Sequence, residues 1–104
     1  MDKYRIDITE PAEIDLIEVG NYIANELLEP NIARKVVNKI GEAVLMLEEL
    51  PFRNALVTDE RLANQGIRKI IVENYMVFYI VTEESKTVTI VRILYGRRDW
   101  INLL

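Results

Sequence analysis

A chain of 104 residues, half of them hydrophobic and 29% charged, has the composition of a single globular domain, residues 1–104. The absence of both Cys and His excludes disulfides, thiol nucleophiles, imidazole bases and nearly every zinc site, and we expect neither a cofactor nor a metal. The apolar runs are short and interrupted by charges, so we expect no membrane contact and a cytoplasmic location.

The charge is unevenly distributed along the chain. The overall net charge of −4 argues against binding nucleic acid by bulk electrostatics. Residues 1–52 carry five Lys or Arg against eleven Asp or Glu, net −6, whereas residues 53–104 carry eight against six, net +2. The acidic residues of the first half can be a solvated helix face. The basic residues of the second half are the candidates for contact with a partner.

The first elements expected are a strand and a helix. Apolar and polar residues alternate over 4–8, as in a strand with one buried face, and Thr9 can cap a helix whose first turn contains Pro11. Apolar residues recur at three- and four-residue spacing over 16–28, with the acidic residues on the remaining arc. Gly20 lies on the apolar stripe, which predicts close approach of a neighbouring element.

A second amphipathic pattern follows almost at once. Residues 29–31 break the first helix, apolar spacing resumes over 33–50, and Pro51 ends it. Two helices joined by so short a connection must be antiparallel neighbours. Residues 52–65 show no clear period, so we expect a surface loop ending at Gly66.

Three strands complete the predicted fold, at residues 67–72, 75–82 and 87–95. The joins at 73–74 and 83–86 are short and polar, as in consecutive hairpins. The sequence therefore predicts an α+β fold in two layers, in the order strand, helix, helix, strand, strand, strand. An antiparallel helix hairpin packs on an antiparallel sheet whose last three strands form a meander.

The second face of this sheet is too apolar for exposure to water. Residues 76–81 are all apolar, and both faces of the last strand are largely apolar, whereas a sheet covered by helices on one side should be polar on the other. Either another part of the chain covers this face, with residues 99–104 able to cover some of it, or a partner protein does.

Three motifs in the second half of the chain carry a family resemblance. They are Gly66-Ile67-Arg68-Lys69, then Tyr75-Met76-Val77-Phe78-Tyr79, then Val91-Arg92-Ile93-Leu94-Tyr95-Gly96-Arg97-Arg98-Asp99. Their order and spacing resemble the pattern of the ParE branch of the RelE/ParE toxin superfamily: Gly-x-Arg-Arg/Lys, Tyr-x-x-Phe-Tyr, and a final Arg-Val-Leu-His-Gly-x-Arg-Asp. The resemblance covers essentially the whole chain.

The resemblance implies the toxin half of a bacterial type II toxin–antitoxin module, of the kind associated with plasmid stabilization. RelE-like toxins cut mRNA in the ribosomal A site, and ParE-like toxins poison DNA gyrase. This chain has Met76 where the RelE branch commonly has Arg, and Tyr95 where many members have His. Both departures favour a non-enzymatic gyrase inhibitor.

The resemblance also implies a cognate antitoxin, a small DNA-binding protein whose C-terminal segment folds onto the toxin, so that this chain reaches DNA only through it. An amphipathic helix could lie along the acidic helix hairpin, or a strand could be added to an open sheet edge.

The residues expected to bind the target are Arg68, Lys69, Arg97, Arg98 and Trp100. We expect the meander to gather Arg68, Arg97 and Arg98 at one end as an exposed cationic patch. Three of the five residues also have a simpler structural explanation. Arg68 could pair with an acidic helix residue, Lys69 could extend from a sheet edge, and Trp100 could cover the core.

Two alternatives remain open. A ribosome-dependent mRNA endoribonuclease would use Arg68, Arg97 and Arg98 to hold the phosphate charge and Tyr95 or Tyr79 as acid or base, although a phenol with a pKa near 10 is a poor base at neutral pH. Tyr75, Phe78 and Tyr79 lie on a predicted strand, where aromatic side chains most often pack in the core or across strands. A non-toxic family member would act only in antitoxin binding and autoregulation.

Overall fold

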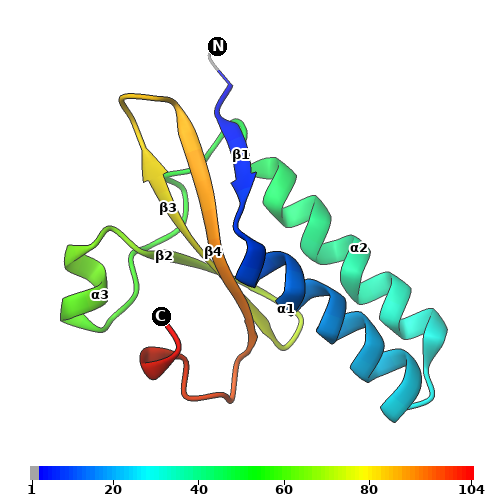
Figure 1. The fold of residues 1–104 in the computed structure, drawn as a ribbon. Coiled ribbons are helices and arrows are strands. Elements are labelled where there is room, and N and C mark those ends of the chain that lie inside the picture. Colours follow the sequence, from blue (N-terminus) through cyan, green and yellow to red (C-terminus); the bar gives the residue numbers. More distant parts are fainter. Residues whose placement is uncertain (1–2) are drawn as a thin grey trace.

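The computed structural model describes residues 3–104 and confirms the predicted order of strand, two helices and three strands (Figure 1). The long elements are β1 (Arg5–Ile8), α1 (Glu10–Asn21), α2 (Pro30–Met46), β2 (Arg68–Val72), β3 (Tyr75–Thr82) and β4 (Thr87–Tyr95). A π-helical turn at Tyr22–Glu26 extends α1, α3 occupies Glu60–Asn64, and a 3₁₀ turn lies at Trp100–Asn102.

The four strands form one sheet in the order β1-β4-β3-β2. The antiparallel meander of β2, β3 and β4 is confirmed. The sheet as a whole is mixed, however, because β1 pairs with β4 in parallel, from Arg5 opposite Thr87 to Ile8 opposite Ile90. Both helices and the first two strands of the meander separate this pair in the chain, and such a long connection is what a parallel pair requires.

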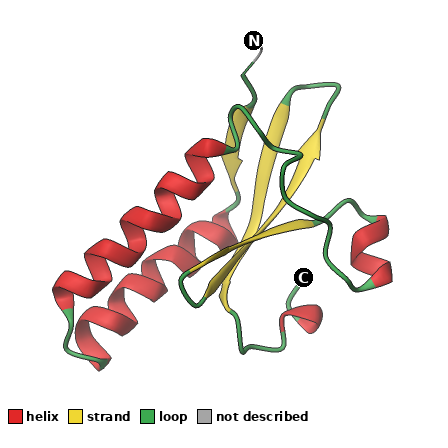
Figure 2. Ribbon diagram, turned by 180° about the vertical axis from the view of Figure 1, so that it is seen from behind, coloured by secondary structure: helices red, strands yellow, loops and turns green. Residues whose placement is uncertain are grey.

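The helix hairpin covers one face of the sheet (Figure 2). Thr9 caps α1 as predicted, since its hydroxyl accepts the amide of Ala12. α2 lies close to Gly20, as predicted, but a Cβ at this position would lie 3.4 Å from a methyl carbon of Val37, at the short end of ordinary van der Waals contact, so the approach does not require glycine. The core on this face consists of Ala12, Val19, Ile23, Ala33, Val36, Ile40, Val44, Leu47, Val77, Tyr79, Val88, Ile90 and Ile93.

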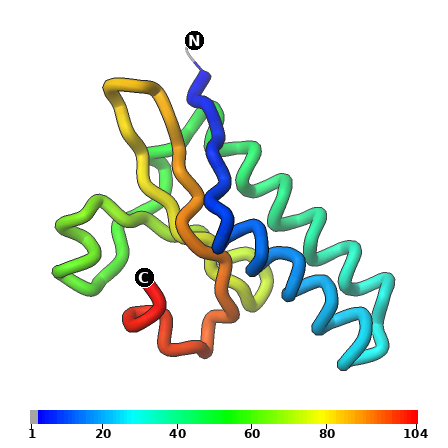
Figure 3. Tube along the Cα trace, in the orientation of Figure 1, coloured from blue at the N-terminus to red at the C-terminus, as the bar shows by residue number. Residues whose placement is uncertain are grey.

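The chain itself covers the opposite face, which decides between the two alternatives left by the sequence. In Figures 1 and 3, α3 and the C-terminal segment lie across the sheet from the helix hairpin. Buried residues of this second core are Val57, Leu62, Ile67, Met76, Phe78 and Leu94, and Trp100, Leu103 and Leu104 pack against them.

The prediction of an irregular loop over residues 52–65 is wrong at α3. The Asp59 carboxylate accepts the amide of Leu62 and so caps this short helix, which buries Leu62 in the second core. An Asp before a Glu and an apolar residue is a helix-start signal, but one turn is too short to show a period.

The helix that the sequence predicts as continuous through Leu28 changes character near its end. The π-helical turn replaces the last α-helical turn, and Leu28 adopts a left-handed conformation with φ of 55°. In the part of the chain that the structure describes, no helix combines the length and the apolar character needed to cross a membrane.

Candidate functional site at the end of the sheet

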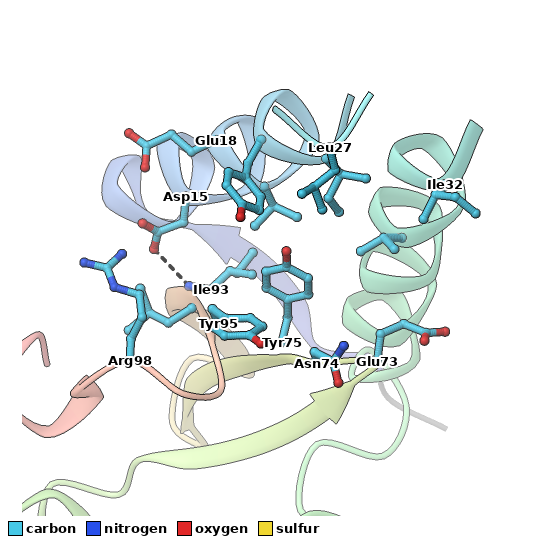
Figure 4. Close-up of a pocket in the computed structure, with 15 residues that line it drawn as sticks. Asp15, Glu18, Leu27, Ile32, Glu73, Asn74, Tyr75, Ile93, Tyr95 and Arg98 are labelled. Atoms are coloured by element: carbon cyan, nitrogen blue, oxygen red, sulfur yellow. Dashed lines mark hydrogen bonds between the residues drawn. The ribbon is translucent and has the colours of Figure 1, made fainter. Parts of the chain in front are cut away.

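A cavity of about 610 Å³ opens between the helix hairpin and the end of the sheet at which β4 finishes (Figure 4). One wall comes from α1 and its π-helical extension, a second from α2, and the floor from β4 and the turn between β2 and β3. We call this cavity the terminal groove. Its lining residues are Asp15, Glu18, Val19, Tyr22, Ile23, Leu27, Ile32, Val36, Glu73, Asn74, Tyr75, Ile93, Leu94, Tyr95 and Arg98.

A close backbone contact holds the floor of the groove. The Gly96 amide donates to the Asn74 carbonyl at 2.8 Å, and a Cβ at Gly96 would lie 3.3 Å from the same oxygen, so glycine permits this approach. The rings of Tyr75 and Tyr95 then meet edge to face, with centroids 5.7 Å apart. Burial raises the pKa of Tyr75, so its phenol stays protonated at neutral pH.

An ion pair between α1 and β4 closes one side of the groove. Asp15 accepts Arg92 Nε at 2.7 Å and Nη2 at 2.8 Å, and it also accepts the Ile93 amide at 3.0 Å (Figure 4 shows the Ile93 bond). β1 has ended at Ile8, so Asp15 supplies the acceptor that a neighbouring strand would otherwise give to this edge of β4. The bond to Asp15 raises the pKa of Arg92, which is thereby fixed as an internal cation.

Asp15 is buried, so the prediction that it lies on the solvated arc of the first helix is wrong. Its side chain is only 6% exposed. The signal was available, because Asp15 lies three residues after Ala12 and four before Val19, both on the buried face. Arg92 between apolar residues of a strand was a second signal, since a buried cation requires a partner.

The structure brings Tyr95, Arg97 and Arg98 together at the end of β4. All three are exposed, and the Arg98 amide donates to the Tyr95 carbonyl at 3.0 Å, which tightens the turn. Within residues 3–104, neither Arg97 nor Arg98 forms a salt bridge. The Arg98 side chain extends toward Asp15 and Glu18 on the α1 wall (Figure 4).

Arg68 lies elsewhere, so the prediction of one patch containing Arg68, Arg97 and Arg98 is wrong. Arg68 pairs with Tyr79 on β3, whereas the end of β4 pairs with Tyr75. The spacing of four residues from Tyr75 to Tyr79 corresponds to about 13 Å of strand. Arg68 Nη1 donates to the Asn54 carbonyl at 2.6 Å, and the guanidinium lies 5.1 Å from the Phe52 ring. Arg68 therefore holds the segment before α3 instead of meeting an acidic helix.

Trp100 and Lys69 lie on the second core, away from the groove. The Trp100 ring packs on Phe78 with centroids 5.1 Å apart, and Lys69 Nζ lies 5.9 Å from the Trp100 ring. These positions match the simpler structural explanations, because Trp100 covers the second core and Lys69 extends from the edge strand β2. Tyr79 is fully buried and donates its hydroxyl to the Pro51 carbonyl at 2.8 Å, so it is a core residue as well.

The family comparison agrees with this architecture. The family model described as the ParE toxin of the type II toxin–antitoxin system parDE matches residues 6–100. The chain belongs to the ParE toxin family. Within this ParE-family chain, Met76 is buried in the second core, so the position at which the RelE pattern carries Arg contributes here to packing.

Solved structures share this ParE-family fold. A chain of the chromosomal ParDE toxin–antitoxin system from P. aeruginosa is 24% identical, with 89% of this chain and 96% of that chain covered and a TM-score of 0.72. The toxin–antitoxin complex RelBE2 from Mycobacterium tuberculosis gives 22% identity, coverage of 91% and 93%, and a TM-score of 0.65. A mutant of E. coli RelE in the free state gives 16% identity, coverage of 97% and 92%, and a TM-score of 0.67. No curated protein matches the chain in sequence.

Proposed function

We propose that this ParE-family chain is a toxin that inhibits DNA gyrase by binding it. The observation that carries this proposal is the match of the ParE toxin family over residues 6–100. The end of β4 supports it, because Arg97 and Arg98 are exposed and form no salt bridge with any residue of 3–104. Such guanidinium groups are free to form bidentate bonds with carboxylates or phosphates of a target.

The target-binding residues we propose are Tyr95, Arg97 and Arg98. Tyr95 is exposed and precedes the two arginines in the same turn. Arg68, Lys69 and Trp100 were also expected to bind the target, but each has an internal contact that accounts for its position. We therefore assign them a supporting role, in which Trp100 and Lys69 anchor the segment that follows the two arginines.

The gyrase proposal is tested with the purified chain in supercoiling and cleavage-complex assays. We expect inhibition by the wild type and a large loss of inhibition in the double variant Arg97→Ala, Arg98→Ala. The matched control is Arg34→Ala, Lys35→Ala, which removes two adjacent exposed cations from α2. No effect of the wild type at micromolar concentration would overturn the gyrase proposal.

The ribonuclease alternative has weaker support. Arg68 is not gathered with Tyr95, Arg97 and Arg98, because its backbone lies about 13 Å along the strands from the end of β4 and its guanidinium is bonded to the Asn54 carbonyl. Cleavage also requires a proton acceptor, and the buried Tyr79 hydroxyl is already bonded to Pro51. Primer-extension mapping on translated mRNA would detect specific cuts; their presence, and their loss in Arg98→Ala, would favour the enzyme over the gyrase inhibitor.

We also propose that an antitoxin protein silences this chain in the cytoplasm and provides its only contact with DNA. Solved structures of this fold include the ParDE and RelBE2 toxin–antitoxin systems. The antitoxin is tested by expressing the chain with and without the short open reading frame beside its gene. Growth arrest that the second protein relieves is expected; no arrest by the chain alone would favour a non-toxic family member.

A further inference from the structure

Asp15 is a buried acid on α1 that needs a counter-charge. Asp15 and Thr87 are the only buried polar residues in the part of the chain that the structure describes, and of the two only Asp15 is charged. Arg92 donates to its carboxylate from Nε and Nη2, and the Ile93 amide donates at 3.0 Å. A buried carboxylate binds the nearest cation strongly, because no water solvates its charge.

A second guanidinium points at the same carboxylate. Asp15 and Arg98 both line the terminal groove, and in Figure 4 the Arg98 side chain extends toward the Asp15 carboxylate. Arg98 nevertheless forms no salt bridge with any residue of 3–104. The fold therefore directs two arginines, Arg92 and Arg98, at one buried acid, and only Arg92 is bound to it.

The surroundings of Arg92 explain why it is the arginine that binds. Arg92 lies on β4 opposite Phe78 of β3, and its Nη1 also donates to the Leu103 carbonyl at 3.3 Å. Arg98 lies in an exposed turn, so binding Asp15 would remove the conformational freedom of its side chain. Three donors already fill most of the acceptor sites of the Asp15 carboxylate, and the charge of Arg92 repels a second cation.

Glu18 is the other free acid near Arg98, and it differs from Asp15 in its exposure. Glu18 lines the same groove but is exposed, and within the described residues it forms no salt bridge. An ion pair between exposed side chains contributes little, because water solvates both charges. Of the two acids, only the buried one would hold Arg98 firmly.

We propose that Arg92 is a positioning residue for target binding, because its occupation of Asp15 keeps Arg98 free in the turn. This inference rests on the proposed toxin function. Without the Arg92 guanidinium, the Asp15 carboxylate captures Arg98. One of the two proposed target-binding cations then becomes an internal ion pair, although its own sequence position is unchanged.

The test measures the Kd of the full chain for purified DNA gyrase by calorimetry. Arg92→Gln removes the guanidinium, and we expect it to weaken binding about 10- to 100-fold, the range for losing one hydrogen-bonded charge. Adding Asp15→Asn removes the carboxylate that captures Arg98, so the double variant should bind within about threefold of the wild type.

The matched control separates capture from a general loss of stability. Glu18→Gln in the Arg92→Gln background removes an exposed acid from the same groove and should not restore binding. Both Arg92→Gln and its combination with Asp15→Asn lack the Asp15–Arg92 pair, so a purely structural role of that pair would weaken binding in both. Circular dichroism at the temperature of the binding measurement checks that each variant is folded.

Nuclear magnetic resonance of the arginine side chains gives a measurement that does not depend on the target. In the wild type, the Nε proton of Arg98 should exchange rapidly with water, because this side chain lies in an exposed turn. In Arg92→Gln its exchange should slow by about tenfold or more, and it should become rapid again when Asp15→Asn is added. The variant Arg98→Ala identifies the signal.

The outcomes distinguish this inference from the proposed function. Rapid exchange at Arg98 in Arg92→Gln, or weakened binding that Asp15→Asn does not restore, would overturn the inference and leave the gyrase proposal intact. A wild-type chain that does not bind gyrase would overturn the proposed function, and with it the role given to Arg92 in target binding.

Discussion

The arginines in and just after the end of β4 have two opposite kinds of surroundings. Arg92 lies inside the strand and is held by both carboxylate oxygens of Asp15, with a further bond from Nη1 to the Leu103 carbonyl. Arg97 and Arg98, a few residues later, lie in an exposed turn and form no salt bridge within the described residues. One region uses its cation to join α1, β4 and the C-terminal segment, and the other leaves its cations available.

The difference teaches that a motif rich in arginine does not identify its binding residues by itself. All three arginines belong to the same motif, but only those beyond the last paired residue of the strand escape internal partners. A cation in a sheet must be paired because desolvation is costly, whereas a cation in a turn remains hydrated until a partner arrives.

The largest expected effect is that of removing the internal partner. Asp15→Ala leaves the Arg92 guanidinium, whose side chain is 22% exposed, without its counter-charge and the Ile93 amide without an acceptor. We expect the free energy of unfolding to fall by about 3–5 kcal/mol, measured by urea denaturation at neutral pH. Glu18→Ala, one turn later on the exposed face, is the control and should have little effect. A loss as small as that of the control would show that the pair is not structural.

A smaller effect is expected at the other internal polar contact. Tyr79→Phe removes the hydroxyl that donates to the Pro51 carbonyl and accepts from Asn54 at 3.3 Å. The Pro51 carbonyl then lacks this partner, and we expect a loss of about 1–3 kcal/mol in the free energy of unfolding. Tyr95→Phe, at an exposed tyrosine, is the matched control. Equal stability of the two variants would contradict the distinction between internal and exposed groups.

High pH should weaken the internal region selectively. Burial is the largest cause that raises the pKa of Tyr75 and of Tyr79 above the ordinary phenol value, so the unfolded chain ionises first. Their contribution to stability is complete below a pH of about 10, the pKa of a free phenol, and is lost as the pH rises through the higher folded pKa. Urea midpoints measured across this range should fall, and the fall should be shallower in Tyr79→Phe. An equal slope in that variant would be evidence against a raised Tyr79 pKa.

The smallest effect on stability is expected at the exposed cations. Arg97→Ala and Arg98→Ala should each change the free energy of unfolding by no more than about 0.5 kcal/mol, because neither side chain has an ion-pair partner among residues 3–104. Thermal or urea denaturation measures this. If either variant were as unstable as Asp15→Ala, the two regions would not differ, and the proposal that Arg97 and Arg98 serve binding would lose its basis.

Local patterns predicted most of the secondary structure, because apolar spacing reports directly the period of a helix or a strand. The limits of β3 and β4 and the Thr9 cap follow from residues close together in the sequence. Short-range signals failed where an element was a single turn, as in α3, or where the helix changed to a π-helical turn after Asn21.

The sequence by itself therefore determined the order of the elements, the antiparallel meander and the family, since each depends on spacing along the chain. Only the tertiary structure decided that Asp15 pairs with Arg92, 77 residues away, that Arg68 lies apart from Arg98, and that an apolar groove remains beside Tyr95. The ion pair and the groove depend on how far α1 extends along β4 and where β1 ends, and the position of Arg68 depends on the register of the meander. Contacts between separate segments set all three, and periodicity within one segment carries no information about them.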